Sequence, residues 1–308
     1  MRLLLLLLLL STQALAQTAD TLRLRRHLLA LTSTPEPRNY LHEASLNQAA
    51  DYIKTELQAA GARPTEQPYE VQGRTYRNIL GSFGPETGPR LVIGAHYDVC
   101  GEQPGADDNG TGVAALLELA RLLSQQKQPL PCRIDLVAYT LEEPPFFRTP
   151  QMGSYVHAQS LRAAGVPVRG MVALEMLGYY DDRRGSQRYP LGLLKLLFGS
   201  RGNYVTVAQK FGNGRFGRQL ARRYKGAASL PVKRFKAPAW LPGIDFSDHL
   251  NYWHFGYPAV LLTDTAFYRN HHYHQPTDTL SRLDMRRLGL AVEALLAVVL
   301  GQEEARSS

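Results

Sequence analysis

Strand-like and helix-like segments alternate along most of this 308-residue chain. Residues 91–95 form a short apolar run, and residues 110–123 repeat apolar side chains at helical spacing. A second strand-like run follows at 134–139, and the alternation continues toward the C-terminus. Because parallel strands are joined by crossover helices that cover both faces of the sheet, this alternation predicts an α/β fold with a largely parallel sheet.

The remaining segments fit the same plan. The part 17–62 is expected to form an N-terminal pair of helices, because apolar residues recur every three or four positions over 22–31 and 46–60. No repeat or low-complexity linker divides the chain, so 17–308 is predicted to be a single domain. The other predicted elements are strands 69–71, 76–83, 170–174, 204–208, 231–235 and 259–263 and helices 154–164, 215–224, 248–255 and 284–300.

The first residues have the organisation of an export signal. A basic start at Met1-Arg2 precedes eight leucines at 3–10, and Ala14-Leu15-Ala16 fits a small-residue cleavage site. We expect residues 1–16 to be a signal peptide and the mature chain to be exported, either to a periplasm or out of the cell. Eight leucines fall short of the roughly 20 apolar residues of a spanning helix, and no later stretch is longer, so stable membrane insertion is not expected.

The chain has two cysteines, and export would permit them to form a disulfide. Cys100 follows one predicted strand, whereas Cys132 begins the next, with a helix between them. If the two strands are parallel neighbours, the two sulfur atoms lie at opposite ends of the sheet, too far apart to be bridged. We therefore predict two free thiols.

Positive charge is concentrated in one basic segment, residues 183–244. It contains 14 Lys and Arg and no Asp or Glu, which leaves −6 for the rest of a chain whose formal net charge is +8. Nucleic-acid binding is not expected, because the chain is predicted to be exported and has no recognition motif. The segment is either a solvated basic face or a surface that attracts anionic substrates or an anionic envelope surface. If it steers substrates, Arg222, Arg223 and Lys225 are expected to contribute.

Acids and histidines follow the predicted strands, where the functional groups of open α/β sheets gather. His96 and Asp98 end the strand at 91–95. Residues i and i+2 share one side of an extended backbone, so Asp98 can hydrogen-bond the ring nitrogen of His96 that faces away from a metal. Taken alone, such a pair is more often an ordinary surface pair than a metal site.

Further candidate ligands follow at the same edge of the predicted sheet. Asp107 and Asp108 precede a helix, where Asp108 or Asn109 is also expected to be a helix cap. Glu142 and Glu143 follow the strand at 134–139, and Glu175 lies between two apolar residues, where an unpaired carboxylate is costly to bury. His271, His272 and His274 crowd together near the C-terminal helix. One Asp, two Glu and two His offer oxygen and nitrogen ligands for two zinc ions that share a carboxylate.

In this order the motifs resemble peptidase family M28 over about residues 46–300. The motifs that carry the resemblance are His96-x-Asp98, Ala106-Asp107-Asp108-Asn109-Gly110, Glu142-Glu143, Glu175-Met176, Ser247-Asp248-His249, and His274 with Asp278. The resemblance implies the three-layer α/β sandwich of zinc exopeptidases (phosphorylase/hydrolase-like), with a mixed, mostly parallel sheet of about eight strands. It also implies a peptide substrate.

The resemblance further implies a role for each site residue. His96 and Glu175 would bind one Zn²⁺, Glu143 and His274 would bind the other, and Asp107 would bridge the two. Glu142 would be the general base and Asp98 would hold His96, with Asp108, Asp248 and His249 in supporting positions, although Asp248 is equally consistent with a helix cap. A cis peptide bond is implied between Asp107 and Asp108.

An aminopeptidase is the activity that the resemblance favours, and three alternatives stay open. Glu175 stands where many aminopeptidase members have Asp, so a carboxypeptidase is a second reading. A glutaminyl cyclase has the same fold with one zinc ion, but typically lacks the second acid of the Asp107-Asp108 pair. A binding protein that kept the fold and lost catalysis should have lost ligands, and none is missing here.

Overall fold

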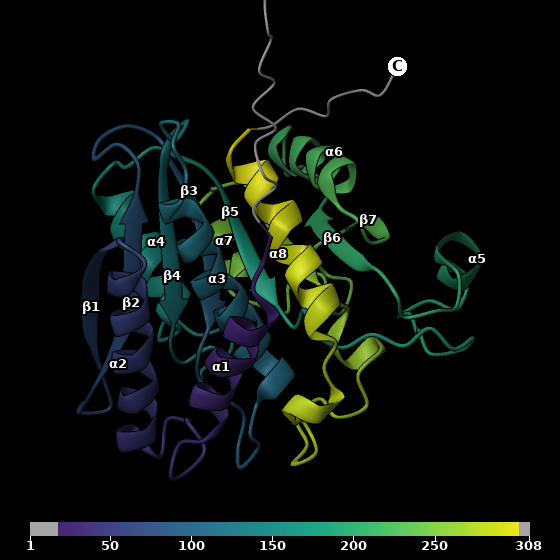
Figure 1. Ribbon diagram of the computed structural model, residues 1–308, viewed down its shortest axis with the longest axis horizontal. Coiled ribbons are helices and arrows are strands. Elements are labelled where there is room, and N and C mark those ends of the chain that lie inside the picture. Colours follow the sequence, from purple (N-terminus) through teal and green to yellow (C-terminus); the bar gives the residue numbers. More distant parts are fainter. Residues whose placement is uncertain (1–17, 302–308) are drawn as a thin grey trace, which may run out of the picture.

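One eight-stranded sheet runs through the computed structural model, which describes residues 18–301 (Figure 1). The signal peptide predicted at 1–16 lies outside the described residues. The strands are β1 (Arg63–Val71), β2 (Arg74–Phe83), β3 (Arg90–His96), β4 (Arg133–Tyr139), β5 (Val168–Glu175), β6 (Val205–Lys210), β7 (Val232–Ala237) and β8 (Ala259–Thr263). The helices are α1 (Thr21–Thr32), α2 (Glu43–Ala59), α3 (Gly112–Ser124), α4 (Gly153–Ala163), α5 (Leu194–Phe198), α6 (Phe216–Ala227), α7 (His249–His254) and α8 (Met285–Val299), with shorter turns η1 (Ala106–Thr111), η2 (Ala266–Tyr268) and η3 (Leu280–Arg282).

The strand order is β1-β2-β4-β3-β5-β8-β6-β7. The four central strands β4, β3, β5 and β8 run parallel, and β6 runs parallel to β7. The pairs β1–β2, β2–β4 and β6–β8 are antiparallel. The predicted mixed, mostly parallel sheet of about eight strands is therefore confirmed.

Helices cover both faces of the sheet, as Figure 1 shows. The side chains of β5 pack against helices on both faces. Val172 and Leu174 pack into the core formed with α1, α2, α3, α6 and α8, whereas Met171 and Ala173 pack on the other side with α4 and α7. Successive side chains of a strand point to opposite faces, so an apolar run with two buried faces requires a helical layer on each. The three-layer sandwich follows from this requirement.

The N-terminal helices predicted from apolar periodicity are present as α1 and α2. Asp20 caps α1 by accepting hydrogen bonds from the backbone N–H groups of Leu22 and Arg23. Strand β1 was predicted only from residue 69, but it begins at Arg63. The strand contains Pro64 and Pro68, which is compatible with its position at the edge of the sheet.

Cys100 and Cys132 are both free, as predicted. Among residues 18–301, no helix has the length and apolar character needed to cross a membrane.

The basic segment 183–244 does not form one surface. Its helix α6 packs against α8, and Arg223 lines a shallow hollow together with Leu91 and Cys132, at the beginnings of β3 and β4. The acids and histidines follow the opposite ends of these strands. Since Arg222, Arg223 and Lys225 all belong to α6, the expectation that they steer a substrate toward those acids is not supported by their position.

Candidate metal centre

The carboxyl ends of three parallel strands bring together the side chains that the sequence singled out. His96 is the last residue of β3, Glu142 and Glu143 follow β4, and Glu175 is the last residue of β5. All four are buried, with exposed fractions between 1% for His96 and 7% for Glu175. The parallel register of the central strands therefore places these groups at one edge of the sheet, as expected.

Asp108 lies at the centre of this cluster. One of its carboxylate oxygens, Oδ1, is 3.5 Å from His96 Nε2, and the other, Oδ2, is 3.2 Å from His274 Nε2. Glu175 Oε2 is 3.3 Å from the same nitrogen of His96, and Glu143 Oε2 is 3.2 Å from that of His274. The carboxylate of Asp108 thus faces one histidine–glutamate pair with each of its two oxygens.

Asp107, which was predicted to bridge the two metals, faces the other way. Its Oδ1 accepts hydrogen bonds from Thr111 Oγ1 at 3.0 Å and the Gly178 N–H at 3.0 Å. Its Oδ2 accepts one from Asn270 Nδ2 at 2.8 Å. Both oxygens of Asp107 are used inside the protein, where they support the loop. Asp108, not Asp107, is the residue that lies between the two histidine–glutamate pairs.

The predicted cis peptide bond is likewise one residue out of place. The cis bond joins Asp108 to Asn109, not Asp107 to Asp108.

The wide turn η1 that carries Asp108 is fixed by hydrogen bonds from several directions. Asp278 accepts the backbone N–H groups of Asp107 and Asp108 at 3.0 and 3.1 Å. Asn109 donates to the Leu174 carbonyl at 2.8 Å and accepts the Met176 N–H at 3.1 Å, which ties η1 to the end of β5. The orientation of Asp108 is therefore set by its neighbours on both sides in sequence.

Arg38 is a supporting residue that sequence reasoning missed. Its side chain is 1% exposed and donates to the backbone carbonyls of Leu31, Tyr97, Pro104 and Gly105. Gly105 has φ +63°, and a Cβ there would lie 2.2 Å from Val99 Cγ1. Arg38 thus binds the loop that leads from β3 into η1, at a point where only glycine fits. Nothing in the local sequence marks Arg38, since its partners are main-chain carbonyls distant in the chain.

Asp98 supports the site in a different way from the one predicted. Its carboxylate accepts the backbone N–H groups of Glu142 at 3.2 Å and Glu143 at 3.0 Å. His96 Nδ1 is 3.2 Å from the main-chain carbonyl oxygen of Asp98 and 3.6 Å from its carboxylate. Asp98 therefore positions the two glutamates, and mainly its backbone faces the imidazole.

Of the three clustered histidines, only His274 reaches the site. It stacks on Tyr273, with the ring centroids 3.8 Å apart, whereas His272 bonds Thr277 Oγ1 instead. Cys100 also lies close: its sulfur is within 4.8 Å of ligand atoms of Glu143 and His274.

Asp248 and His249 are buried at the start of α7. Asp248 occupies the N-cap position of α7, as the cap reading expected, but its side chain makes no capping hydrogen bond. Burial raises the pKa of Asp248 to about 7, with nearby Glu175 adding to the shift. His249 places its Nε2 2.8 Å from the Ile244 carbonyl and packs edge-on against Trp253, so its contacts are those of a structural residue.

Negative charge is in excess within the cluster. Burial raises the pKa of Glu143 to about 7, and the neighbouring Asp108 carboxylate adds to the shift. Burial also raises the pKa of Glu142 and Glu175. For His274, burial lowers the pKa, but the adjacent carboxylates of Asp108 and Glu143 outweigh it and raise the pKa to about 10. Four buried carboxylates and two imidazoles form an environment that favours added positive charge.

The donor atoms fit divalent metal ions. Asp108 Oδ2, Glu143 Oε1 and His274 Nε2 are buried and have no hydrogen-bond partner within residues 18–301. Such unpaired buried polar atoms are costly unless another group binds them. Imidazole nitrogen and carboxylate oxygen are typical zinc ligands. His96, Asp108 and Glu175 form one candidate group, and His274 and Glu143 on the far side of Asp108 form the basis of a second.

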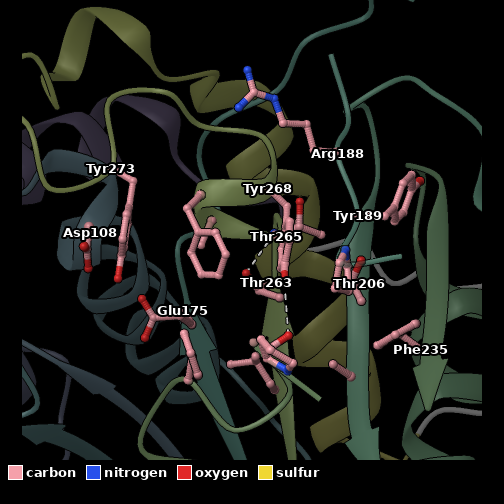
Figure 2. A pocket seen from close by; sticks show the side chains of 18 of the residues that line it. Asp108, Glu175, Arg188, Tyr189, Thr206, Phe235, Thr263, Thr265, Tyr268 and Tyr273 are labelled. Atoms are coloured by element: carbon pink, nitrogen blue, oxygen red, sulfur yellow. Dashed lines mark hydrogen bonds between the residues drawn. The ribbon is translucent and has the colours of Figure 1, made fainter. Parts of the chain in front are cut away.

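A cavity of about 230 Å³ opens beside the cluster. Figure 2 shows Asp108 and Glu175 on one side of it and Tyr189 and Phe235 on the other. In the same view the hydroxyl end of Tyr273 is turned toward the two carboxylates. The candidate metal centre is thus one end of a longer pocket, whose remaining walls come largely from residues 187–273.

Two relatives of known sequence match most of this chain. The chain is 44% identical over 285 residues to the uncharacterized protein YfbL of Escherichia coli (strain K12), a match that covers 90% of this chain and 87% of that protein. It is 24% identical over 293 residues to the probable leucine aminopeptidase 1 of Trichophyton verrucosum, with 89% and 72% covered.

Solved structures share the fold. The LapA aminopeptidase of Legionella pneumophila superimposes with a TM-score of 0.72 at 20% identity, over 92% of this chain and 73% of that one. A glutaminyl cyclase of Bacteroides thetaiotaomicron gives 0.70 at 19% identity, over 94% and 100%.

The family model described as "Peptidase family M28" matches residues 78–299. This range spans β3, β4 and β5 together with every residue of the cluster built above. The chain therefore belongs to peptidase family M28.

Proposed function

We propose that this chain is an exported aminopeptidase that holds two zinc ions on either side of Asp108. The observation that carries the proposal is the position of the Asp108 carboxylate, with His96 and Glu175 near one oxygen and His274 and Glu143 near the other. A carboxylate with one histidine–glutamate pair at each oxygen is the arrangement expected of a bridge between two metals.

Aminopeptidase activity is favoured over the alternatives by several features. The curated relatives include proteins named as leucine aminopeptidases. All the proposed metal ligands are present, whereas a binding protein that had lost catalysis should have lost some of them. The glutaminyl cyclases resemble this chain in fold at about 20% identity, which supports the fold alone. Both acids of the Asp107-Asp108 pair are present, and each has a defined role.

Glu142 is the proposed general base. Its Oε2 lies 3.8 Å from His96 Nε2, on the pocket side of the cluster. Bound zinc ions would supply Lewis-acid activation of a water molecule and of the scissile carbonyl. Glu142 would take the proton from the attacking water and return it to the leaving amine. Asp98 would keep Glu142 and Glu143 in place through their backbone N–H groups.

Export is the part of the proposal that rests on sequence alone. The basic start, the run of leucines and the Ala14-Leu15-Ala16 site support a signal peptide over residues 1–16.

Peptide hydrolysis and its direction can be tested with purified protein. We expect cleavage of aminoacyl substrates with a free amino terminus, complete loss of activity after chelation, and recovery on addition of Zn²⁺. Release of carboxyl-terminal residues from N-blocked peptides would identify a carboxypeptidase instead. Cyclisation of N-terminal glutamine without hydrolysis would identify a cyclase.

Replacement of Glu142 by Gln tests the general base. Because the change removes the proton acceptor and leaves the proposed ligands alone, kcat should fall about 10²–10⁴-fold with both zinc ions retained. Glu102→Gln, which changes an exposed glutamate, is the matched control and should be active. Near wild-type turnover in zinc-loaded Glu142→Gln would rule out this role.

The bridging residue can be identified from metal content. Asp108→Asn should lower the bound zinc from two ions per chain to one or none, because a neutral amide is a poor bridge between two cations. Asp107→Asn should keep two ions, with a lower melting temperature from the weakened bonds to Thr111, Gly178 and Asn270.

Asp135→Asn is the control for loss of a buried carboxylate, since Asp135 pairs with Arg90 and Arg133 at the other end of β4. Loss of zinc from the Asp107 variant with full occupancy in the Asp108 variant would reverse our assignment.

A further inference from the structure

The pocket extends from the metal centre along a single row of paired strand residues. Glu175 of β5 is paired with Thr263 of β8, Thr263 with Thr206 of β6, and Thr206 with Lys233 of β7. All four line the same pocket. Residues paired across neighbouring strands project from the same face of a sheet, so this row forms a continuous floor that begins at a proposed metal ligand and ends at a lysine.

The length of the floor follows from sheet geometry. Neighbouring strands lie about 4.8 Å apart, so three steps put the Cα of Lys233 about 14 Å from that of Glu175. A short side chain bound at the metal centre would leave the far end unfilled. Figure 2 shows this depth, with Thr263 and Thr206 between Glu175 on one side and Phe235 on the other.

The far end of the pocket is aromatic. Tyr189 stacks on Phe198 with ring centroids 6.2 Å apart, and Phe198 meets Phe235 edge-on at 5.8 Å. Phe235 is two residues from Lys233 in β7, so the two side chains share one face of the strand. The row therefore leads between aromatic walls to a lysine ammonium.

In the part of the chain that the structure describes, no carboxylate forms an ion pair with Lys233. Its ammonium donates to the Phe198 carbonyl and lies 3.5 Å from the ring centroid of Tyr204. Burial and then the nearby Arg269 guanidinium lower the pKa of Lys233 to about 8.

Arg269 is itself buried and donates to Gln187 Oε1 and to the carbonyls of Tyr179 and Tyr204. Within residues 18–301, neither cation forms an ion pair at contact distance. The nearby carboxylate of Asp264 interacts with Arg269, whereas burial and Arg269 are what act on Lys233, so the uncompensated positive charge at the end of the pocket is that of Lys233.

We propose that this pocket binds the side chain of the substrate's N-terminal residue and that Lys233 selects long side chains ending in a hydrogen-bond acceptor, with a carboxylate preferred. The inference rests on the proposed aminopeptidase activity. An ammonium has three donors, and the Phe198 carbonyl uses one of them. The others can meet an acceptor carried on an aromatic side chain of the right length, where a charged hydrogen bond is stronger than a neutral one.

A competing explanation gives Lys233 a structural role only. By donating to Phe198 it holds the end of α5 against the pocket. In that case removal of the ammonium should affect all substrates to the same extent, and the wild type should not distinguish a carboxylate from a hydrogen atom at the end of the side chain.

Three substrates of matched shape separate the two explanations: the p-nitroanilides of phenylalanine, tyrosine and 4-carboxyphenylalanine. In the wild type, we expect kcat/KM to rise in this order, with the carboxylate at least about tenfold above phenylalanine. Lys233→Met should abolish the preference, so that the ratio of kcat/KM for 4-carboxyphenylalanine to kcat/KM for phenylalanine falls to about one. Lys233→Glu should make the 4-carboxyphenylalanine substrate the poorest of the three.

Lys236→Met is the matched control. Lys236 lies on the same strand but on the opposite face, where its ammonium is 5.3 Å from the ring centroid of Phe211, and its loss should leave the preference unchanged. Equal wild-type values for the three substrates, or a uniform loss in Lys233→Met, would overturn the proposal.

Failure of the proposed activity can be told apart from failure of this inference. If none of the three substrates is cleaved, the aminopeptidase proposal fails. Calorimetric titration with free 4-carboxyphenylalanine and phenylalanine then decides the pocket's role by itself. Tighter binding of the carboxylate in the wild type but not in Lys233→Met supports it, and equal binding in the wild type refutes it.

Discussion

Several carboxylates buried side by side at the ends of β3, β4 and β5 form an arrangement that is unfavourable without added positive charge. Asp108, Glu143 and Glu175 are each less than 8% exposed. The imidazoles of His96 and His274 lie among them, and the Arg38 guanidinium is close enough to interact with Asp108 and Glu143. Added positive charge at this place would balance the negative charge of these buried carboxylates. Two further carboxylates support this cluster. Asp98 accepts the backbone N–H groups of Glu142 and Glu143, and Asp278 accepts those of Asp107 and Asp108. Within residues 18–301, Asp108 Oδ2 and Glu143 Oε1 make no hydrogen bond.

The same sheet that assembles the centre also extends into the proposed specificity pocket. Strand β8 lies between β5 and β6, so a substrate side chain bound as we propose would pass Thr263 and Thr206 on its way from Glu175 to Lys233. These four residues are far apart in the sequence, but each lies one strand away from the next in the sheet. This explains how part of the basic segment comes to line the pocket while α6, from the same segment, lies at the opposite end of the sheet.

The fold was predictable because the buried strands and their covering helices have distinct apolar patterns, and the ligand strands could be placed because parallel strands end at one edge. The sequence could not show that Asp108, and not the predicted Asp107, faces the two histidine–glutamate pairs. Within η1 the backbone leaves helical geometry at Asp108 and Asn109, so no simple periodicity tells which of two adjacent carboxylates faces the pocket. The supporting role of Arg38 could not be predicted for another reason. Its side chain binds main-chain carbonyls, which every residue has, so no pattern of partner side chains points to it.

The central claim is that Asp108 lies between two metals, and a crystal structure of the zinc-loaded protein tests it most directly. Data collected at the zinc absorption edge should show two anomalous peaks, one near His96 and Glu175 and the other near His274 and Glu143, each within about 2.2 Å of a different oxygen of Asp108. A single peak, or a peak whose bridging carboxylate is that of Asp107, would contradict the account.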